Sequence, residues 1–109
     1  MVCMNEQMET LGIWQEEGAE VIQELSKIRR SGPSFCRKGT DVPNMVYLQQ
    51  EVMDFLILME CAIETGLFIP PTNQELYEYR KNKLERLAKW SELGNVVQRI
   101  QRRDSAKHA

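Results

Sequence analysis

The sequence has little of the chemistry on which zinc sites and disulfide frameworks depend. It holds one histidine, His108, and three cysteines, Cys3, Cys36 and Cys61, which are widely spaced and form no Cys-x-x-Cys pair. Zinc sites are built mainly from cysteine and histidine at short spacings, so the sequence argues against a zinc protein. An odd number of scattered cysteines is typical of free thiols in a reducing compartment, which we expect to be the cytoplasm.

Proline, glycine and long hydrophobic runs are also scarce. Four prolines and six glycines occur in 109 residues, and long stretches contain neither, which favours α-helices. The longest apolar run covers residues 55–59 and is far too short to span a bilayer. Glu6 and Glu9 stand where a signal peptide would need a basic start and an apolar segment. We therefore expect a cytoplasmic protein with no membrane association.

The charged residues are divided unevenly along the chain. Residues 1–79 carry 13 acidic and 5 basic side chains, a net charge of −8, whereas residues 80–109 carry 9 basic and 3 acidic ones, a net charge of +6. This division suits a site for a metal and a phosphate chain, although a basic tail is also a common solvated feature. We expect a single domain over residues 1–109, with a core over about 6–91 and a basic C-terminal extension over about 92–109.

Apolar residues recur at helical spacing in three long segments. The periodicity predicts helices over about residues 6–30, 45–66 and 72–90, a short final helix around 96–100, and a loop over 31–45. Gly32 and Gly66 are expected to end the first two helices, and Thr72 and Glu75 have capping-box spacing. The fold class is therefore all-α, a bundle of three to four helices. Because the second helix is apolar almost all round, we expect it at the bundle centre or at a subunit interface.

Two acidic pairs lie on the first two predicted helices. Glu17 and Glu20 are three residues apart, as are Glu51 and Asp54, so each pair occupies one helix face. Packed side by side, the helices would bring four carboxylates around one point, and the small residue Gly18 would allow a close approach. An all-oxygen site of this kind suits Mg²⁺ or Mn²⁺. Either pair alone also fits an ordinary solvated helix face, an interpretation that the apolar flanks of the second pair weaken.

The acidic residues together form a recognisable motif. Glu16, Glu17 and Glu20 read Glu-Glu-x-x-Glu, and Glu51 and Asp54 then read Glu-x-x-Asp. A basic segment with an embedded asparagine follows over residues 81–91 (KNKLERLAKWS). This combination resembles the MazG-type all-α nucleoside triphosphate pyrophosphatases. Residues 16–32 (EEGAEVIQELSKIRRSG) are similar to the first active-site helix of short MazG-like proteins, many of them phage-encoded, and the resemblance covers roughly residues 11–91.

The resemblance implies an enzyme that hydrolyses the bond between the α and β phosphates of (d)NTPs or related nucleotides, a guanosine alarmone included. The products would be a monophosphate and pyrophosphate. Family members hold Mg²⁺ with carboxylates that match Glu17, Glu20, Glu51 and Asp54, and they assemble as homodimers or tetramers. Glu16 is a further catalytic candidate that would orient the attacking water, although its place on the helical wheel fits a solvated glutamate equally well.

The resemblance also implies phosphate contacts from the basic helix, at Asn82, Lys83 and Arg86. Lys27 and Arg30 could reach phosphates too, but basic residues are common at helix C-termini for dipole reasons. A solvent-exposed basic face is the alternative for the residues of the third helix. The sequence departs from the family pattern in two places: the segment between the acidic motifs, residues 21–50, is somewhat longer, and the spacing from Asn82 to Arg86 is one residue wider.

Three functions stay open at this point. The first is the Mg²⁺-dependent pyrophosphohydrolase. The second is a catalytically weak protein that binds or sequesters nucleotides on the same scaffold. The third is a helical interaction module whose basic tail docks on nucleic acid, which is weakly supported because no aromatic interleaving or helix-turn-helix spacing accompanies the tail. Trp14 and Trp90 are interpreted as core residues, with stacking of Trp14 on a base as the alternative.

Overall fold

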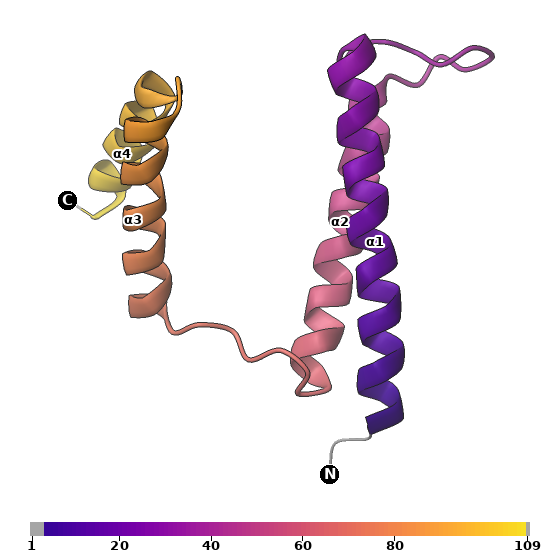
Figure 1. Ribbon diagram of the computed structural model, residues 1–109, viewed down its shortest axis with the longest axis horizontal. Coiled ribbons are helices and arrows are strands. Elements are labelled where there is room, and N and C mark those ends of the chain that lie inside the picture. The colour runs from indigo at the N-terminus through magenta and orange to yellow at the C-terminus, as the bar shows by residue number, and fades with distance from the viewer. Residues whose placement is uncertain (1–3, 109) are drawn as a thin grey trace. The chain divides into compact units, whose positions relative to one another are not determined.

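The computed structural model describes residues 4–108 and is built from helices (Figure 1). In chain order these are α1 (Met4–Ser31), α2 (Asn44–Glu64), α3 (Asn73–Trp90) and α4 (Gly94–His108). Extended pairing within the described part of the chain is limited to an isolated bridge between Cys36 and Pro43. The prediction of an all-α chain with three to four helices is confirmed. Cys36 and Cys61 carry free, exposed thiols, and Cys3 lies outside the described residues.

The helices form two compact units within the single domain predicted over residues 1–109. The first ends at Pro70 and contains α1 and α2, and the second begins at Pro71 and contains α3 and α4. The boundary falls between two adjacent prolines, which cannot donate backbone hydrogen bonds and so interrupt helical structure.

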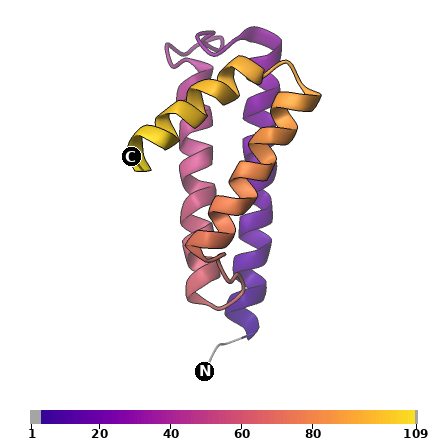
Figure 2. The ribbon, with the colours of Figure 1, turned by 90° about the vertical axis from the view of Figure 1, so that its left-hand side faces the viewer.

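The first unit is an antiparallel helical hairpin, and its two helices lie side by side in both views (Figures 1 and 2). Near the open end, Nε2 of Gln7 donates a 2.8 Å hydrogen bond to the carbonyl oxygen of Thr65, which fixes the start of α1 against the end of α2. Trp14 lies between two rings, with centroids 5.6 Å from Phe55 and 5.8 Å from Phe68. Its interpretation as a packing residue agrees with these contacts.

The connection between α1 and α2 is ordered by backbone hydrogen bonds. Gly32 has a φ of +91° and donates its N–H to the carbonyl of Ile28 at 2.7 Å, so α1 ends in the left-handed glycine cap that the sequence predicts. Beyond it the chain doubles back, and the N–H of Asn44 donates to the carbonyl of Phe35 at 2.9 Å. This hydrogen bond brings the beginning of the loop onto the first residue of α2.

The second unit is a smaller hairpin held by a cap, an ion pair and a few apolar contacts. Thr72 and Glu75 form the predicted capping box in both directions, at 3.1 and 3.0 Å. The guanidinium of Arg80 pairs with the carboxylate of Asp104 through two hydrogen bonds of 3.1 and 3.2 Å. Leu84 and Val97 are the apolar residues that this unit buries.

Two expectations for the second unit are wrong. Trp90 was interpreted as core, but it is 76% exposed, with the Lys89 ammonium 5.0 Å from its ring centroid. It is the last residue of α3, where the helix ends. The final helix is also longer than the short one expected around residues 96–100, because the basic tail continues it as α4 to His108.

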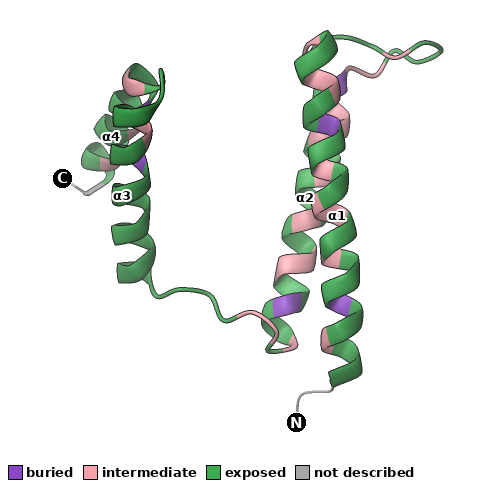
Figure 3. Ribbon diagram, viewed as in Figure 1, coloured by how far each residue is buried: buried purple, intermediate pink, exposed green. Residues whose placement is uncertain are grey.

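Burial is concentrated on the facing sides of α1 and α2, whereas their outer surfaces are exposed (Figure 3). Of the apolar side chains on α2, Ala62 is fully buried, whereas Met53 is 61% and Ile57 51% exposed. Across residues 4–108, every helix is too short or too polar to cross a membrane.

Candidate functional site

The structure brings acidic residues of α1 and α2 together near the middle of the first hairpin. Glu17, Glu51 and Asp54 each place one carboxylate oxygen within 4.8 Å of the other two. The helices can approach closely here because Gly18 has no side chain. A Cβ at this position would lie 3.4 Å from Cε2 of Phe55. We call these three residues, together with Glu20, the acidic cluster.

Glu20 belongs to the acidic cluster through its contact with Glu51. A side-chain hydrogen bond between the two residues, followed by burial and by repulsion from the neighbouring carboxylates, raises the pKa of Glu51 to about 7. With this pKa, Glu51 is partly protonated near neutral pH.

The pKa of Glu17 is also raised above its ordinary value of 4.5. Burial is the largest cause, and repulsion by Glu20 and Asp54 adds to it. Among the side chains of residues 4–107, no basic one forms an ion pair with a member of the acidic cluster. The cluster thus concentrates negative charge that the described part of the chain does not neutralise.

Two oxygen atoms of the cluster fit a divalent cation in particular. Oε2 of Glu17 and Oε2 of Glu51 are shielded from solvent and have no hydrogen-bond partner. A buried acceptor without a partner is unfavourable, and a buried ionised carboxylate oxygen more so. Mg²⁺ and Mn²⁺ prefer carboxylate oxygens, and a cation between the two helices would satisfy both atoms. The residues present therefore fit the predicted metal.

The remaining acidic residue of the first motif, Glu16, is not among the converging carboxylates, although its charge is close enough to contribute to the raised pKa of Glu17. Its side chain is exposed on α1, as its position on the helical wheel predicts. Trp14, one turn before Glu17, has an indole Nε1 that is buried without a hydrogen-bond partner. Trp14 packs against α2, and the acidic cluster begins one turn further along α1. The aromatic contacts and the carboxylates are therefore neighbours between the same two helices.

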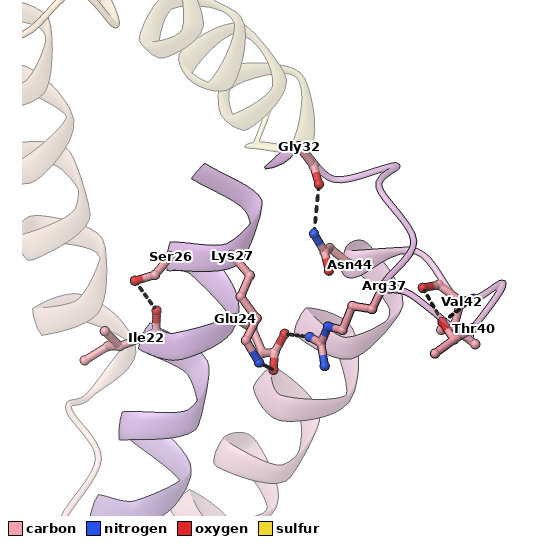
Figure 4. A network of polar contacts seen from close by, with 9 residues as sticks. All are labelled: Ile22, Glu24, Ser26, Lys27, Gly32, Arg37, Thr40, Val42 and Asn44. Carbon is pink, nitrogen blue, oxygen red and sulfur yellow. Dashed lines mark hydrogen bonds and ion pairs between the residues drawn. The ribbon is translucent and has the colours of Figure 1, made fainter. Parts of the chain in front are cut away.

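A different polar network surrounds Glu24, two turns further along α1 (Figure 4). The side chain of Glu24 is buried, and Nζ of Lys27 lies 3.2 Å from its Oε1. The guanidinium of Arg37, from the loop, lies 2.5 Å from its Oε2 and also stacks over the ring of Tyr47, 4.0 Å from the centroid. Glu24 lies seven residues after Glu17 on the same edge of α1, but it pairs with two cations.

The candidate phosphate-binding residues lie in two places. Lys27 is committed to Glu24, whereas Arg30 is exposed near the end of α1. Asn82, Lys83 and Arg86 are all exposed on α3 and therefore belong to the second unit. Asn82 and Arg86 share one face of α3 because they are four residues apart. Their participation in a common site with the acidic cluster stays a prediction.

Two residues that the sequence analysis did not select stand out in the structure. These are Arg37 in the loop and Asn44 at the start of α2. Nε of Arg37 and Oδ1 of Asn44 are both buried without a hydrogen-bond partner. The loop holds two glycines and two prolines and shows no periodicity, so no pattern in the sequence indicated that these side chains would face the helices.

Comparisons of the chain with protein-family models, with curated proteins and with solved structures find no match. The functional interpretation therefore rests on the site itself and on the motif that it contains.

Proposed function

We propose that the protein is a MazG-like nucleotide pyrophosphohydrolase that depends on Mg²⁺, with Mn²⁺ as a substitute. The observation that supports this most strongly is the convergence of Glu17, Glu51 and Asp54 within 4.8 Å, with buried, unpartnered oxygens on the two glutamates. The carboxylates come from two helices, and on two of the three residues one oxygen is shielded from solvent, which favours a binding site over two separate solvated faces. The Glu-Glu-x-x-Glu and Glu-x-x-Asp motif adds the reaction class by resemblance.

In this proposal the acidic cluster holds the cation. Glu17, Glu51 and Asp54 would offer the first oxygens, and Glu20 would complete the set. A divalent ion bound there supplies positive charge for phosphate oxygens and lowers the pKa of a coordinated water. The apolar packing of Trp14 and Phe55 behind the cluster holds the two helices at the spacing that the carboxylates need.

The substrate would lie over the acidic cluster with its phosphate chain exposed to basic side chains. Arg30 of α1 is free to contact a phosphate, with Lys27 behind it, and Asn82, Lys83 and Arg86 of α3 are the candidates from the second unit. Water would add to the α phosphorus, and the bond from that phosphorus to the bridging oxygen would break. Glu16, exposed beside Glu17, would accept a hydrogen bond from the attacking water.

A nucleotide-binding protein without turnover is the second candidate, and one observation favours it. The pKa of Glu51 is raised to about 7, so near neutral pH a proton competes with a cation for the oxygens of this carboxyl group. If the cation binds weakly, the chain would retain its basic side chains but lack an activated water. We place the protein in the cytoplasm, where free thiols such as those of Cys36 and Cys61 persist.

We also propose that the protein works as a homodimer or tetramer. The outer surface of α1 and α2 exposes large apolar side chains, among them Ile22 at 65%, Leu25 at 50% and Leu56 at 48%. Burying an apolar area of this kind is the main driving force for association. A second copy of the chain would cover it.

The test is product analysis on a panel of nucleoside triphosphates and a guanosine alarmone with Mg²⁺. We expect a monophosphate and pyrophosphate from the parent protein. Glu51→Gln and Asp54→Asn should each lower the rate by at least about 100-fold, because each removes a charged metal ligand while keeping the shape of the side chain. Glu60→Gln, an exposed acidic residue on α2 outside the cluster, should keep the parent rate.

Three outcomes separate the candidates. Turnover that is lost in both cluster variants and kept in the control supports the pyrophosphohydrolase. Nucleotide binding without turnover by the parent protein would point to sequestration. Turnover that survives both cluster substitutions would contradict the site.

A further inference from the structure

One side of α4 is a basic surface. Its members are all exposed, and we call them the basic face: Arg99, Arg102, Arg103 and Lys107 (Figure 3). At 100° per residue, the three arginines lie on the side of the helix opposite Val97, which is 2% exposed. Lys107 follows Arg103 by four residues and continues the surface along one edge.

The packing of α4 on α3 fixes the direction of the basic face. Val97 of α4 and Leu84 of α3 are both buried in the second unit. Asp104, the single acidic residue in the sequence of α4, pairs with Arg80 of α3 through two hydrogen bonds of 3.1 and 3.2 Å. The apolar and acidic positions of α4 therefore face α3, and the basic face is directed away from it.

The basic face carries charge of one sign. Among the side chains of residues 4–107, no carboxylate forms an ion pair with it. Arg99 and Arg103 are four residues apart, as are Arg103 and Lys107, and like charges at this spacing destabilise a helix. A solvated helix face commonly alternates the two signs, whereas a cluster of like charges is typical of an interaction surface. A bound polyanion would relieve the repulsion.

The edge of the basic face borders a hollow between α3 and α4. It encloses about 280 Å³ and is lined by Arg80, Ile100, Arg103, Asp104 and Lys107. Arg80 and Asp104 neutralise each other, so the charges of Arg103 and Lys107 remain in excess. Such an edge suits phosphate oxygens, and an arginine can donate to two of them at once.

The length and composition of the basic face favour a nucleic acid duplex as its partner. From Arg99 to Lys107 the helix rises by about 12 Å at 1.5 Å per residue. A DNA duplex carries one negative charge per roughly 1.7 Å of its axis, so several phosphates lie within that length. The basic face has no aromatic ring on which an unpaired base could stack, as proteins that bind single strands commonly provide.

The distribution of apolar residues on α4 does not favour a membrane surface. A helix that lies on a bilayer inserts a broad apolar side between the lipids. In α4 the corresponding residues are turned toward α3, because Val97 is buried and Ile100 is partly buried. What α4 exposes on its outer side is positive charge.

We propose that the basic face of α4 binds the phosphate backbone of double-stranded nucleic acid without sequence preference. Phosphate contacts position a protein on a duplex but carry no sequence information. The whole chain has a net charge of −2, so the attraction has to come from this local surface. The basic face contains no residue of the proposed catalytic site, and the proposal is independent of nucleotide hydrolysis.

The experiment measures fluorescence anisotropy of labelled duplexes of about 20 base pairs, titrated with the full chain in EDTA and without nucleotide, from about 50 to about 200 mM salt. DNA and RNA duplexes are used, each in two unrelated sequences. We expect affinities within about twofold for the two sequences of one polymer. If all four side chains of the basic face neutralise a phosphate, the affinity should fall on the order of 100-fold over this range of salt.

The test variant combines Arg99→Gln with Arg103→Gln. It should weaken binding at least about tenfold at the lowest salt and make the slope of log affinity against log salt shallower by about 2. Glutamine is a good helix former, so circular dichroism should show the helix content of the parent protein. The matched control combines Arg29→Gln with Lys38→Gln, two exposed basic residues of the first unit. It removes the same net charge and should keep the affinity and the slope of the parent.

The outcomes separate a local surface from general electrostatics and from other partners. Loss of duplex binding in the test variant alone supports the proposal, and tighter binding of DNA or of RNA then identifies the polymer. Equal losses in the test and control variants would overturn it, as would a parent protein that binds no duplex at the lowest salt. Tighter binding to a single strand, or binding only to vesicles of anionic lipid, would also overturn it. None of these results depends on turnover, so the proposed function stands or fails separately.

Discussion

Two glutamates on the same edge of α1, Glu17 and Glu24, have opposite surroundings. Glu24 is buried and meets two cations, Lys27 from its own helix and Arg37 from the loop. Glu17 is partly buried and meets further carboxylates, and one of its oxygens is shielded from solvent without any partner. The two residues are two turns apart and have the same side chain, so the difference comes from the side chains that surround each of them.

The surroundings of the two side chains suit different roles: Glu24 stabilises the fold, whereas Glu17 is available to bind a cation. Burying a charge is unfavourable unless a counter-charge or hydrogen bonds offset it, and breaking a buried pair leaves the other charge uncompensated. Glu24 is already compensated, and its role is to fasten the loop to the hairpin. The acidic cluster around Glu17 has no such ion-pair partner among the described side chains, and a proton on Glu51 or a bound cation would offset part of its charge.

The largest effect expected from this contrast is a pH-dependent stabilisation by Mg²⁺. The pKa of Glu51 is about 7 in the folded protein and near 4.5 in the unfolded chain, so between these values the folded state binds more protons. In EDTA, stability should therefore fall as pH rises from about 4.5 to about 7. Above this window the ionised cluster should bind Mg²⁺ best, and at about 100 times Kd the ion adds about 2.7 kcal/mol.

The measurement is the Tm of the protein at pH 5.5 and pH 8, each with EDTA or with MgCl₂. We expect the increase caused by Mg²⁺ to be clearly larger at pH 8. Glu51→Gln should lose most of that increase and should flatten the pH dependence in EDTA, whereas Glu60→Gln should keep both. An equal increase at the two pH values, or one that Glu51→Gln retains, would show that Mg²⁺ acts elsewhere.

The fold was predictable from the sequence to the extent that it depends on local patterns. The periodicity of α1, the left-handed cap at Gly32 and the capping box at Thr72 each depend on residues within a few positions of one another. The two errors concern longer-range information. The exposure of Trp90 depends on what lies beyond the end of α3, and the length of α4 depends partly on the pairing of Asp104 with Arg80, 24 residues earlier.

The candidate site was predictable in part for the same reason. The spacing of Glu51 and Asp54 put both carboxylates on one helix face, and the small Gly18 indicated where α1 could approach. Asn44 and Arg37 could not be found in this way. Their unpartnered atoms result from how a loop without periodicity folds back onto α2, and the residue types alone fit an ordinary helix start and a solvated loop.

A smaller effect on stability is expected when the charge of Glu24 or of Glu17 is removed. Glu24→Gln leaves Lys27 and Arg37 without their counter-charge and should lower the free energy of unfolding by about 1–3 kcal/mol. We expect the lower half of that range because both cations are about one-third exposed, at 35% and 33%, and water offsets part of the loss. Glu17→Gln in EDTA at pH 8 should leave stability unchanged or raise it, since it removes repulsion.

Urea denaturation of the two variants beside the parent protein checks this contrast, because both substitutions keep the size of the side chain. Opposite directions, or a clear loss in Glu24→Gln alone, would uphold the distinction between the two carboxylates. A comparable loss in both variants would mean that Glu17 has a stabilising partner after all, and the acidic cluster would then be structural.

The smallest expected effect concerns Glu75, whose carboxylate is compensated in a third way. It accepts a hydrogen bond from the backbone N–H of Thr72, which lowers its pKa, while the Thr72 hydroxyl accepts from the N–H of Glu75. Thr72→Ala removes one half of this capping box and should lower the free energy of unfolding by about 1 kcal/mol. Thr72→Ser keeps the hydroxyl and serves as the control, and it should lower the free energy of unfolding by only a few tenths of a kcal/mol.

Because no metal is involved, the effect of Thr72→Ala should be the same in EDTA and in MgCl₂ when measured by urea denaturation. A loss that depended on Mg²⁺ would instead couple the start of α3 to the acidic cluster, and the two kinds of carboxylate would no longer be independent.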